Sequence, residues 1–190
     1  MTVDRFELVT ISGFLEAAEC VALCNIIDRH ARHVEERNLE IIQRAAVPTV
    51  LTRINVMAAT AIQARLARAI GIKPEYCEPL QGQRYVEGQY WEEHWDAFHE
   101  GSPRFIEHVP RAGQRTWTGM IYLNSVEQGG ETVFPAVGVS ITPQPGMALL
   151  WYNLDREGKR HPLAKHYGAQ VIKGSKYVVT TWFRERPYLE

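Results

Sequence analysis

The chain has 190 residues, of which 45% are hydrophobic and 23% charged, a composition typical of globular proteins that excludes disordered, fibrous and collagen-like classes. With 21 basic and 22 acidic residues, its net charge of -1 gives no general attraction to nucleic acid or to an anionic membrane. We therefore predict one domain that binds neither nucleic acid nor membranes.

The cysteines and the N-terminal residues bear on the compartment. Cys20, Cys24 and Cys77 are few, odd in number and without paired CxxC spacing, which argues against a disulfide framework and a structural zinc site. Asp4 and Glu7 stand where a signal peptide needs an apolar run, and no apolar stretch reaches about 18 residues. We expect buried thiols in a reducing cytoplasm.

Two helices are expected before residue 72. The first follows Ser12 as N-cap, and the second spans about 57–70, with Gly71 as C-cap and Pro74 beyond. In both, apolar residues recur three or four positions apart, as on a helix packed against a sheet. The segment 38–53 between them is ambiguous. The two expected apolar stripes comprise Leu15, Ala18, Val21, Ala22 and Ile26, and Ala58, Ile62, Leu66 and Ala69.

From Leu80 onward, β-branched and aromatic runs are divided by Gly, Pro and Asn, a pattern typical of antiparallel sandwiches and barrels. Helices that precede strands indicate an α+β, mainly β domain, in which a helical buttress at about 12–72 supports a double-sheet β core at about 78–186. The expected strands are 81–86, 116–123, 131–134, 138–141, 148–152, 169–172 and 176–183.

A candidate metal site begins at His94 and Asp96, which lie two residues apart and, on an extended segment, project to the same side. This short motif also fits a capped turn, in which Asp96 accepts backbone hydrogen bonds and His94 is merely packed. His166 is the candidate third ligand, because two imidazoles and one carboxylate suit Fe(II) with three open positions.

Two later strands supply candidate cavity walls. Alternation places Lys176 on one face with Val178, Thr180 and Trp182, and an inward ammonium requires an anionic partner. On the strand RTWTGMIYLN, a partly polar face contains Thr116, Thr118, Met120 and Tyr122. This face lines a ligand cavity if it points inward, but carries no function if it is exposed to solvent.

These residues resemble the prolyl 4-hydroxylase-like Fe(II)/2-oxoglutarate dioxygenases. The resemblance covers at least 81–186 and runs in order through RYVEGQYWEEHWD, RTWTGMIYLN, GGETVFP, PQPGMALLWYN and HYGAQVIKGSKYVVTTW. It implies a double-stranded β-helix, or jelly roll, that holds Fe(II) at its open end and 2-oxoglutarate inside. Dioxygen is the implied second cosubstrate, and ascorbate is a further candidate cofactor.

The resemblance also implies roles for single residues. His94, Asp96 and His166 match the iron ligands and hence the catalytic centre, and Lys176 matches the lysine that pairs with the distal carboxylate of 2-oxoglutarate. The remaining cosubstrate-side matches are Tyr85, Thr118, Tyr122 and Trp182, whereas Gly129, Gly130, Thr132, Phe134 and Pro135 match scaffold positions. The other histidines, His30, His33, His99, His108 and His161, are expected at the surface and not on iron.

This chain departs from the family pattern at two positions. Trp91 stands where many relatives have Tyr, which keeps an aromatic wall but removes a hydroxyl. Tyr167 stands where relatives often have a small residue, and we expect it to narrow the entrance to the site.

The resemblance implies hydroxylation of an unactivated C–H bond of a prolyl residue in a peptide or protein, with release of succinate and CO2. One alternative substrate is a free amino acid or another small metabolite, and a second alternative is a jelly-roll binding module without catalysis. The segment 97–114, directly after the His94 and Asp96 pair, is expected to be a mobile substrate loop. The sequence predicts no oligomeric state.

Overall fold

The computed structural model describes residues 6–35, 49–51 and 55–188. Its α-helices are α1 (Ala17–Glu35), α3 (Val56–Ala69) and α4 (Pro103–Ala112). The strands, in chain order, are β1 (Leu8–Ile11), β2 (Thr49–Val50), β3 (Gln81–Val86), β4 (Trp91–His94), β5 (Arg115–Tyr122), β6 (Gln128–Gly129), β7 (Thr132–Phe134), β8 (Val139–Ile141), β9 (Ala148–Tyr152), β10 (His166–Gly168), β11 (Val171–Lys173) and β12 (Ser175–Arg184).

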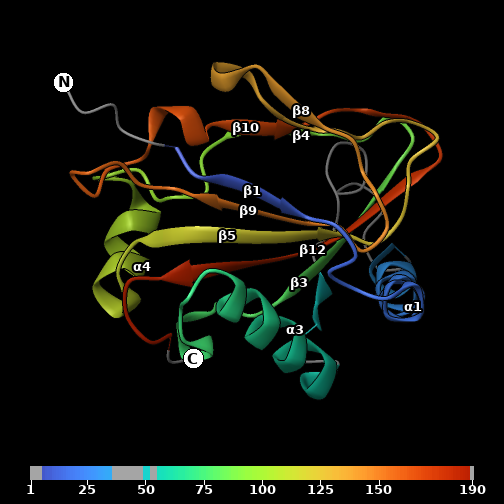
Figure 1. Cartoon of the computed structure of the whole chain (residues 1–190), viewed down its shortest axis with the longest axis horizontal. Helices are drawn as coiled ribbons and strands as arrows, with labels where there is room; N and C mark the ends of the chain where they lie inside the picture. Colours follow the sequence, from blue (N-terminus) through green and yellow to red (C-terminus); the bar gives the residue numbers. More distant parts are fainter. Residues whose placement is uncertain (1–5, 36–48, 52–54, 189–190) are drawn as a thin grey trace.

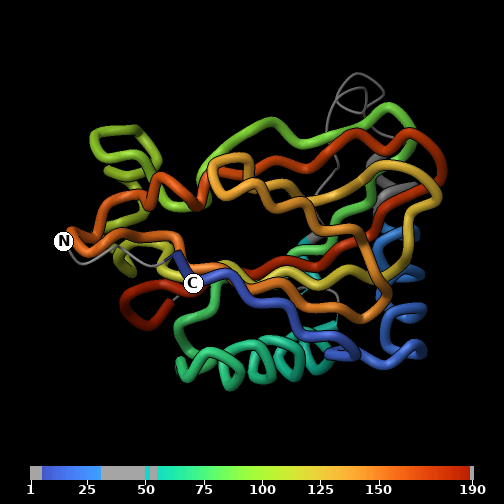
Figure 2. Tube along the Cα trace, turned by 45° about the horizontal axis from the view of Figure 1, so that its top comes forward, coloured from blue at the N-terminus to red at the C-terminus, as the bar shows by residue number. Residues whose placement is uncertain are grey.

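Two antiparallel sheets form the body of the protein. The larger has the strand order β1-β9-β5-β12-β3-β2, the smaller β4-β10-β7-β8, and β11 and β6 form a separate pair. The sheets lie in two layers, with α3 and α1 on the side of the large sheet away from the small one (Figures 1 and 2). The predicted mainly β fold with a jelly-roll core and helical support is confirmed, and the sheets do not close into a barrel.

Strand β5 separates two cores. Ile121 packs with the apolar residues of α1 and α3, while Met120 and Tyr122 pack between the sheets with residues such as Phe134. The alternation expected for this strand is therefore confirmed, and its partly polar face points inward. Thr118 and Tyr122 are fully buried, which excludes the solvent-exposed alternative for this face.

Helix α1 differs from the expected helix in start and in buried face. It begins at Ala17, and its buried residues are Cys20, Leu23 and Ile27 instead of the predicted alanine-rich stripe. Val21 is 61% exposed. The prediction was wrong because Leu15 is buried ahead of the helix, and counting from it shifted the helical phase. Ile27 packs on Gly82 of β3 so closely that a Cβ there would lie 2.6 Å from its Cγ1 atom.

Helix α3 agrees better with the sequence. Asn55 caps it by accepting from the backbone N–H of Ala58, and it ends before Gly71, whose φ of 69° is a left-handed value that suits glycine. Ile62 and Leu66 are buried as predicted, but Ala58 is only half-buried and Ala69 is exposed, because the buried face also includes Ala59, Gln63 and Ala67.

Several predicted segments change. The stretch 169–172 is not one strand, because β10 ends at Gly168 and β11 begins at Val171. Of the ambiguous segment 38–53, residues 38–48 and 52–53 lie outside the described residues, and β2 adds to the edge of the large sheet. The expected loop at 97–114 instead contains α4, capped by Ser102 and ended by Gly113 with a φ of 80°. Its Gly and Pro residues lie at the helix ends, apart from Pro110 in the last turn.

The three cysteines are free, with Cys20 and Cys77 buried and Cys24 half-buried. Burial raises the pKa of Cys24 and of Cys77 to about 12, so both are unreactive thiols at neutral pH. In the described part of the chain, no helix combines the length and the apolar character needed to span a bilayer.

Candidate metal centre and cavity

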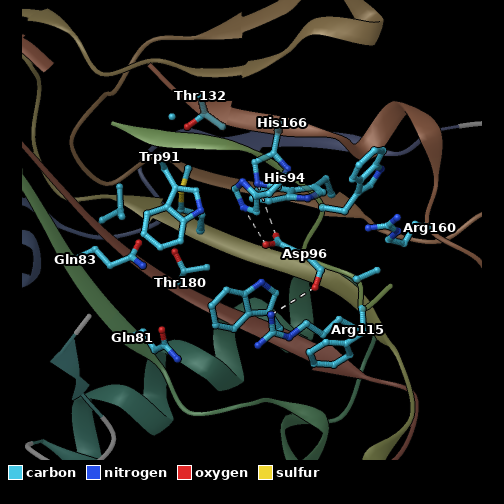
Figure 3. A pocket seen from close by; sticks show the side chains of 18 of the residues that line it. Gln81, Gln83, Trp91, His94, Asp96, Arg115, Thr132, Arg160, His166 and Thr180 are labelled. Atoms are coloured by element: carbon cyan, nitrogen blue, oxygen red, sulfur yellow. Dashed lines mark hydrogen bonds and ion pairs between the residues drawn. The ribbon is translucent and has the colours of Figure 1, made fainter. Parts of the chain in front are cut away.

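Three potential metal ligands meet at one end of the space between the sheets. His94 ends β4, His166 begins β10 and is its direct cross-strand partner, and Asp96 follows in the bend after β4. Their ligand atoms all lie within 4.8 Å of one another, and the side chains converge in Figure 3. The Oδ1 of Asp96 is 3.4 Å from the Nε2 of His94, and its Oδ2 is 3.8 Å from the Nε2 of His166.

Backbone carbonyls select the tautomers of both histidines. The Nδ1 of His94 lies 2.7 Å from the carbonyl oxygen of Glu92, and that of His166 lies 2.9 Å from the carbonyl oxygen of Ala164. Because a carbonyl only accepts, each Nδ1 carries the proton, which leaves each Nε2 lone pair facing Asp96. This is the arrangement in which imidazoles bind a metal.

The carboxylate of Asp96 is held from the opposite side. The hydroxyl of Thr118 donates to its Oδ2 at 2.6 Å, and the side-chain amide of Asn153 donates to that hydroxyl at 2.9 Å. Both supporting residues are buried. Thr118 lies on β5 of the large sheet, and Asn153 directly follows β9 of the same sheet. The large sheet therefore orients a ligand that lies beside the small sheet.

The protonation states also suit a cation. Burial alone would raise the pKa of Asp96, but the imidazoles of His166 and His94 and the Thr118 hydroxyl keep it below its ordinary value. Burial lowers the pKa of His166 to about 4, so this imidazole is neutral at pH 7. The pKa of His94 is instead raised, because Asp96 outweighs the lowering effect of burial, so a metal that binds there would displace a proton from this imidazole. Two imidazoles with one carboxylate fit Fe(II).

We expect Thr118→Val to lower iron affinity about 10- to 100-fold, because it removes the hydrogen bond that orients Asp96 while keeping the side-chain shape. Iron titration followed by the quenching of intrinsic fluorescence measures this. Thr116→Val is the matched control, since its hydroxyl donates to the carbonyl of Phe183 and does not contact Asp96. Equal iron affinities in the two variants would show that Thr118 has no orienting role.

The three ligands line a cavity of about 520 Å³ between the sheets, a volume typical of small-molecule sites. Lys176, Val178, Thr180 and Trp182 of β12 all line it, which confirms that these four share an inward face. Lys176 is 4% exposed, and its Nζ lies 5.5 Å from the ring centres of Tyr85 and Tyr122.

Lys176 has no ion pair or hydrogen bond with any side chain that the structure describes. Burial lowers the pKa of its ammonium to about 8, and Glu131 only partly opposes this. At pH 7 the ammonium therefore remains charged and buried, and the only carboxylate among the described lining residues of the cavity, that of Asp96, faces the histidines instead. Such a group suits one carboxylate of a dicarboxylate ligand, which agrees with its proposed contact to 2-oxoglutarate.

The other predicted cosubstrate residues lie at different depths. Tyr85 and Trp182 line the cavity, and the guanidinium of Arg115 stacks 3.9 Å from the centre of the Trp182 ring. Thr118 lies behind the cavity wall and contacts Asp96. Tyr122 is also behind the wall, where its hydroxyl donates to Thr132 at 2.6 Å.

The two departures from the family pattern have different outcomes. Trp91 lines the cavity as an aromatic wall, with its ring centre 6.0 Å from that of His94 in an edge-to-face arrangement. Tyr167 does not line the cavity, so the expectation that it narrows the entrance was wrong. Strand alternation explains this, because Gly168 and His166 face the cavity and the residue between them faces away.

The remaining histidines stay away from the cluster where the structure describes them. His99 is exposed, and His30 and His108 are half-buried. The side chain of His33 lies outside the described residues. His161 is 3% exposed, so its predicted surface position was wrong. It packs against Phe6 and accepts from the backbone N–H of Leu163.

Sequence reasoning missed several cavity residues. Gln81 and Gln83 alternate with Tyr85 on β3, so the period of two could have placed them on the cavity side (Figure 3). Nothing in the sequence indicated Arg104 or Arg160, which come from α4 and from a connection outside the sheets.

Comparisons with known proteins agree with this geometry. Residues 80–184 match the family model described as the 2OG-Fe(II) oxygenase superfamily. The chain is 36% identical over 124 residues to a putative prolyl 4-hydroxylase of Acanthamoeba polyphaga mimivirus, which covers 65% of this chain and 51% of that protein. It is 35% identical over 143 residues to prolyl 4-hydroxylase 13 of Arabidopsis thaliana, with 67% and 50% covered.

A solved structure is similar over nearly the whole chain. It is the 2OG complex of the viral collagen prolyl hydroxylase from Paramecium Bursaria Chlorella virus-1, at a TM-score of 0.73 and 26% identity, with 93% of this chain and 94% of that chain covered. The chain spans about half the length of the two curated relatives above.

Proposed function

The chain belongs to the 2OG-Fe(II) oxygenase superfamily, and from this we propose that it hydroxylates a prolyl residue of a peptide or protein, with conversion of 2-oxoglutarate to succinate and CO2. One observation carries the proposal. The cluster of His94, Asp96 and His166 opens into the same cavity as the unpaired ammonium of Lys176. The prolyl hydroxylase relatives support the substrate class.

Each of these residues has a distinct task in the proposed reaction. His94, Asp96 and His166 would hold Fe(II), which, with 2-oxoglutarate, supplies the activation of dioxygen. Lys176 would pair with the distal carboxylate of 2-oxoglutarate, so that the opposite end of this cosubstrate faces the ligand cluster. Trp91, Trp151 and Trp182 line the cavity and limit the access of water, which strengthens these charge interactions.

A turnover assay tests the proposal and its alternatives together. The protein is incubated in air with Fe(II), ascorbate and 2-oxoglutarate, and with a proline-containing peptide, free proline or no substrate. We expect peptide-dependent succinate and a peptide that gains one oxygen atom, with neither formed without dioxygen. Oxidation of free proline instead of the peptide would favour the small-metabolite alternative. No succinate with any substrate of a wide panel would favour the non-catalytic module.

We further propose that the protein works in a reducing cytoplasm. The free thiols Cys20, Cys24 and Cys77 support this location. Fractionation of cells that produce the protein at native level, followed by immunodetection, tests it. Recovery with the membrane or extracellular fraction would contradict it.

A further inference from the structure

The charges around the cavity do not balance. Four side chains that are positively charged at pH 7 line it, but Asp96 is the only carboxylate among the described lining residues, and it faces the histidines. Lys176 is assigned to 2-oxoglutarate. Arg115 has an anionic partner, since it forms a bidentate ion pair with Glu78, with both N–O distances at 2.7 Å, and Glu78 also pairs with the buried Arg184 at 3.0 Å. The cations left without an assigned anion are Arg104 and Arg160.

Arg160 is fixed in position without being neutralised. Its guanidinium lies 4.4 Å from the ring centre of Trp95, and its Nη2 is 3.1 Å from the Nδ1 of His99. Because a guanidinium can only donate, the Nδ1 of His99 is the acceptor and is not protonated. Both contacts therefore orient the positive charge but supply no negative one. Burial also lowers the pKa of Arg160, as expected for a cation that has lost water without gaining an anion.

A neighbouring cation shows the contrast. The Nζ of Lys165 lies 4.8 Å from the ring centre of the same Trp95, but it pairs with Glu93 at 2.6 Å. Lys165 does not line the cavity, whereas Arg160 does. Arg160 and Lys165 thus both contact the Trp95 indole. Arg160 is the one that lines the cavity, and it has no carboxylate partner in the described part of the chain. Arg104, in the first turn of α4, likewise forms no ion pair there.

From these contacts we infer that Arg160, together with Arg104, binds a carboxylate of the substrate, so that the preferred substrate is an acidic peptide with Asp or Glu beside the target prolyl residue. The inference rests on the proposed function. Arg160 lies across the metal-ligand cluster from Trp91 and Gln83 (Figure 3). Both arginines come from segments outside the sheets, α4 and the connection between β9 and β10, a placement that favours a peptide over a free amino acid.

Binding can be measured without turnover. Two fluorescent peptides carry one prolyl residue flanked on both sides by Glu or by Gln, and are titrated with the protein loaded with Mn(II) and 2-oxoglutarate in the absence of dioxygen. We expect the Glu peptide to bind roughly tenfold more tightly, as for one charge-assisted contact at a partly dehydrated arginine. Arg160→Gln should reduce this ratio to near one, and Arg160→Lys should restore part of it.

Two further variants make the assignment specific. Lys165→Gln removes the other cation on Trp95 and should keep the preference for Glu. Arg160→Glu should reverse the preference toward a peptide with Lys at the flanking positions. Equal affinities of the wild-type protein for the Glu and Gln peptides would overturn the inference, as would an unchanged ratio in both Arg160→Gln and Arg104→Gln.

Turnover separates this inference from the proposed function. A preference in binding without hydroxylation of either peptide would contradict the proposed function and support the acidic-ligand site. Equal hydroxylation and equal binding of both peptides would support the proposed function and contradict the site. Free proline could also be tested as a competitor. If it competed as strongly as the Glu peptide, and if this competition were lost in Arg160→Gln, the assignment to a peptide would be overturned.

Discussion

Asp96→Ala is expected to abolish succinate formation and to reduce iron affinity more than 100-fold, since loss of even a supporting partner typically costs 10- to 100-fold. Asp96 is the only anionic group in the cluster, so the variant leaves two neutral imidazoles to hold a divalent cation. The protein should stay folded. The Thr118 hydroxyl loses its acceptor at a cost of about 1–3 kcal/mol, less than the stability of a typical domain.

Succinate assays, iron titration and urea unfolding measure these three effects. Asp155→Ala is the matched control, because this aspartate accepts backbone hydrogen bonds in a turn and should change neither iron affinity nor turnover. Succinate formation at the wild-type rate by Asp96→Ala would remove Asp96 from the metal site. A variant that is unfolded at every temperature would show that Asp96 serves the core instead.

Lys176→Met is expected to weaken 2-oxoglutarate binding by at least 100-fold and, at the same time, to stabilise the ligand-free protein. The first effect follows from the loss of a buried charge partner. The second follows because burial lowers the pKa of Lys176 from 10.5 to about 8, which corresponds to a penalty of about 3 kcal/mol for the charged form. Isothermal titration and urea unfolding measure the two effects.

The stability that Lys176→Met gains over the wild-type protein should depend on pH. Below pH 8 the ammonium is charged in both the folded and the unfolded chain, so the full penalty applies and the variant gains most. Between pH 8 and 10.5 the folded state holds fewer protons than the unfolded state, and the advantage of the variant decreases. Lys173→Met, at an exposed lysine paired with Glu127, should change neither quantity. A destabilised Lys176→Met would mean that an internal acid neutralises this lysine.

The sequence was sufficient where a short period decides the arrangement. Alternation on β12 placed Lys176 and Trp182 on one face, and the same rule assigned the two faces of β5. The spacing of His94 and Asp96 also indicated that their side chains lie on one side. In each case neighbouring positions within a few residues determine the result, so no knowledge of the tertiary structure is needed.

The rest depends on contacts that no local pattern contains. Thr118 was expected in the 2-oxoglutarate pocket, but its bond to Asp96 joins residues 22 positions apart. The contact between Arg160 and His99 spans 61 positions. The prediction for 97–114 failed for another reason. The capping signals of α4 at Ser102 and Gly113 were present, but the Gly and Pro content of the segment was interpreted as that of a loop.

The direct pairing of His94 with His166 has a consequence for how this sequence can change in length. Adding or deleting one residue within β4 or β10 would turn every later side chain of that strand to the opposite face, so one imidazole would leave the cluster. The connection at 153–161 runs outside the strands and is under no such constraint. The connection should therefore tolerate insertions and deletions that β4 and β10 do not, although all three segments contribute residues to the same cavity.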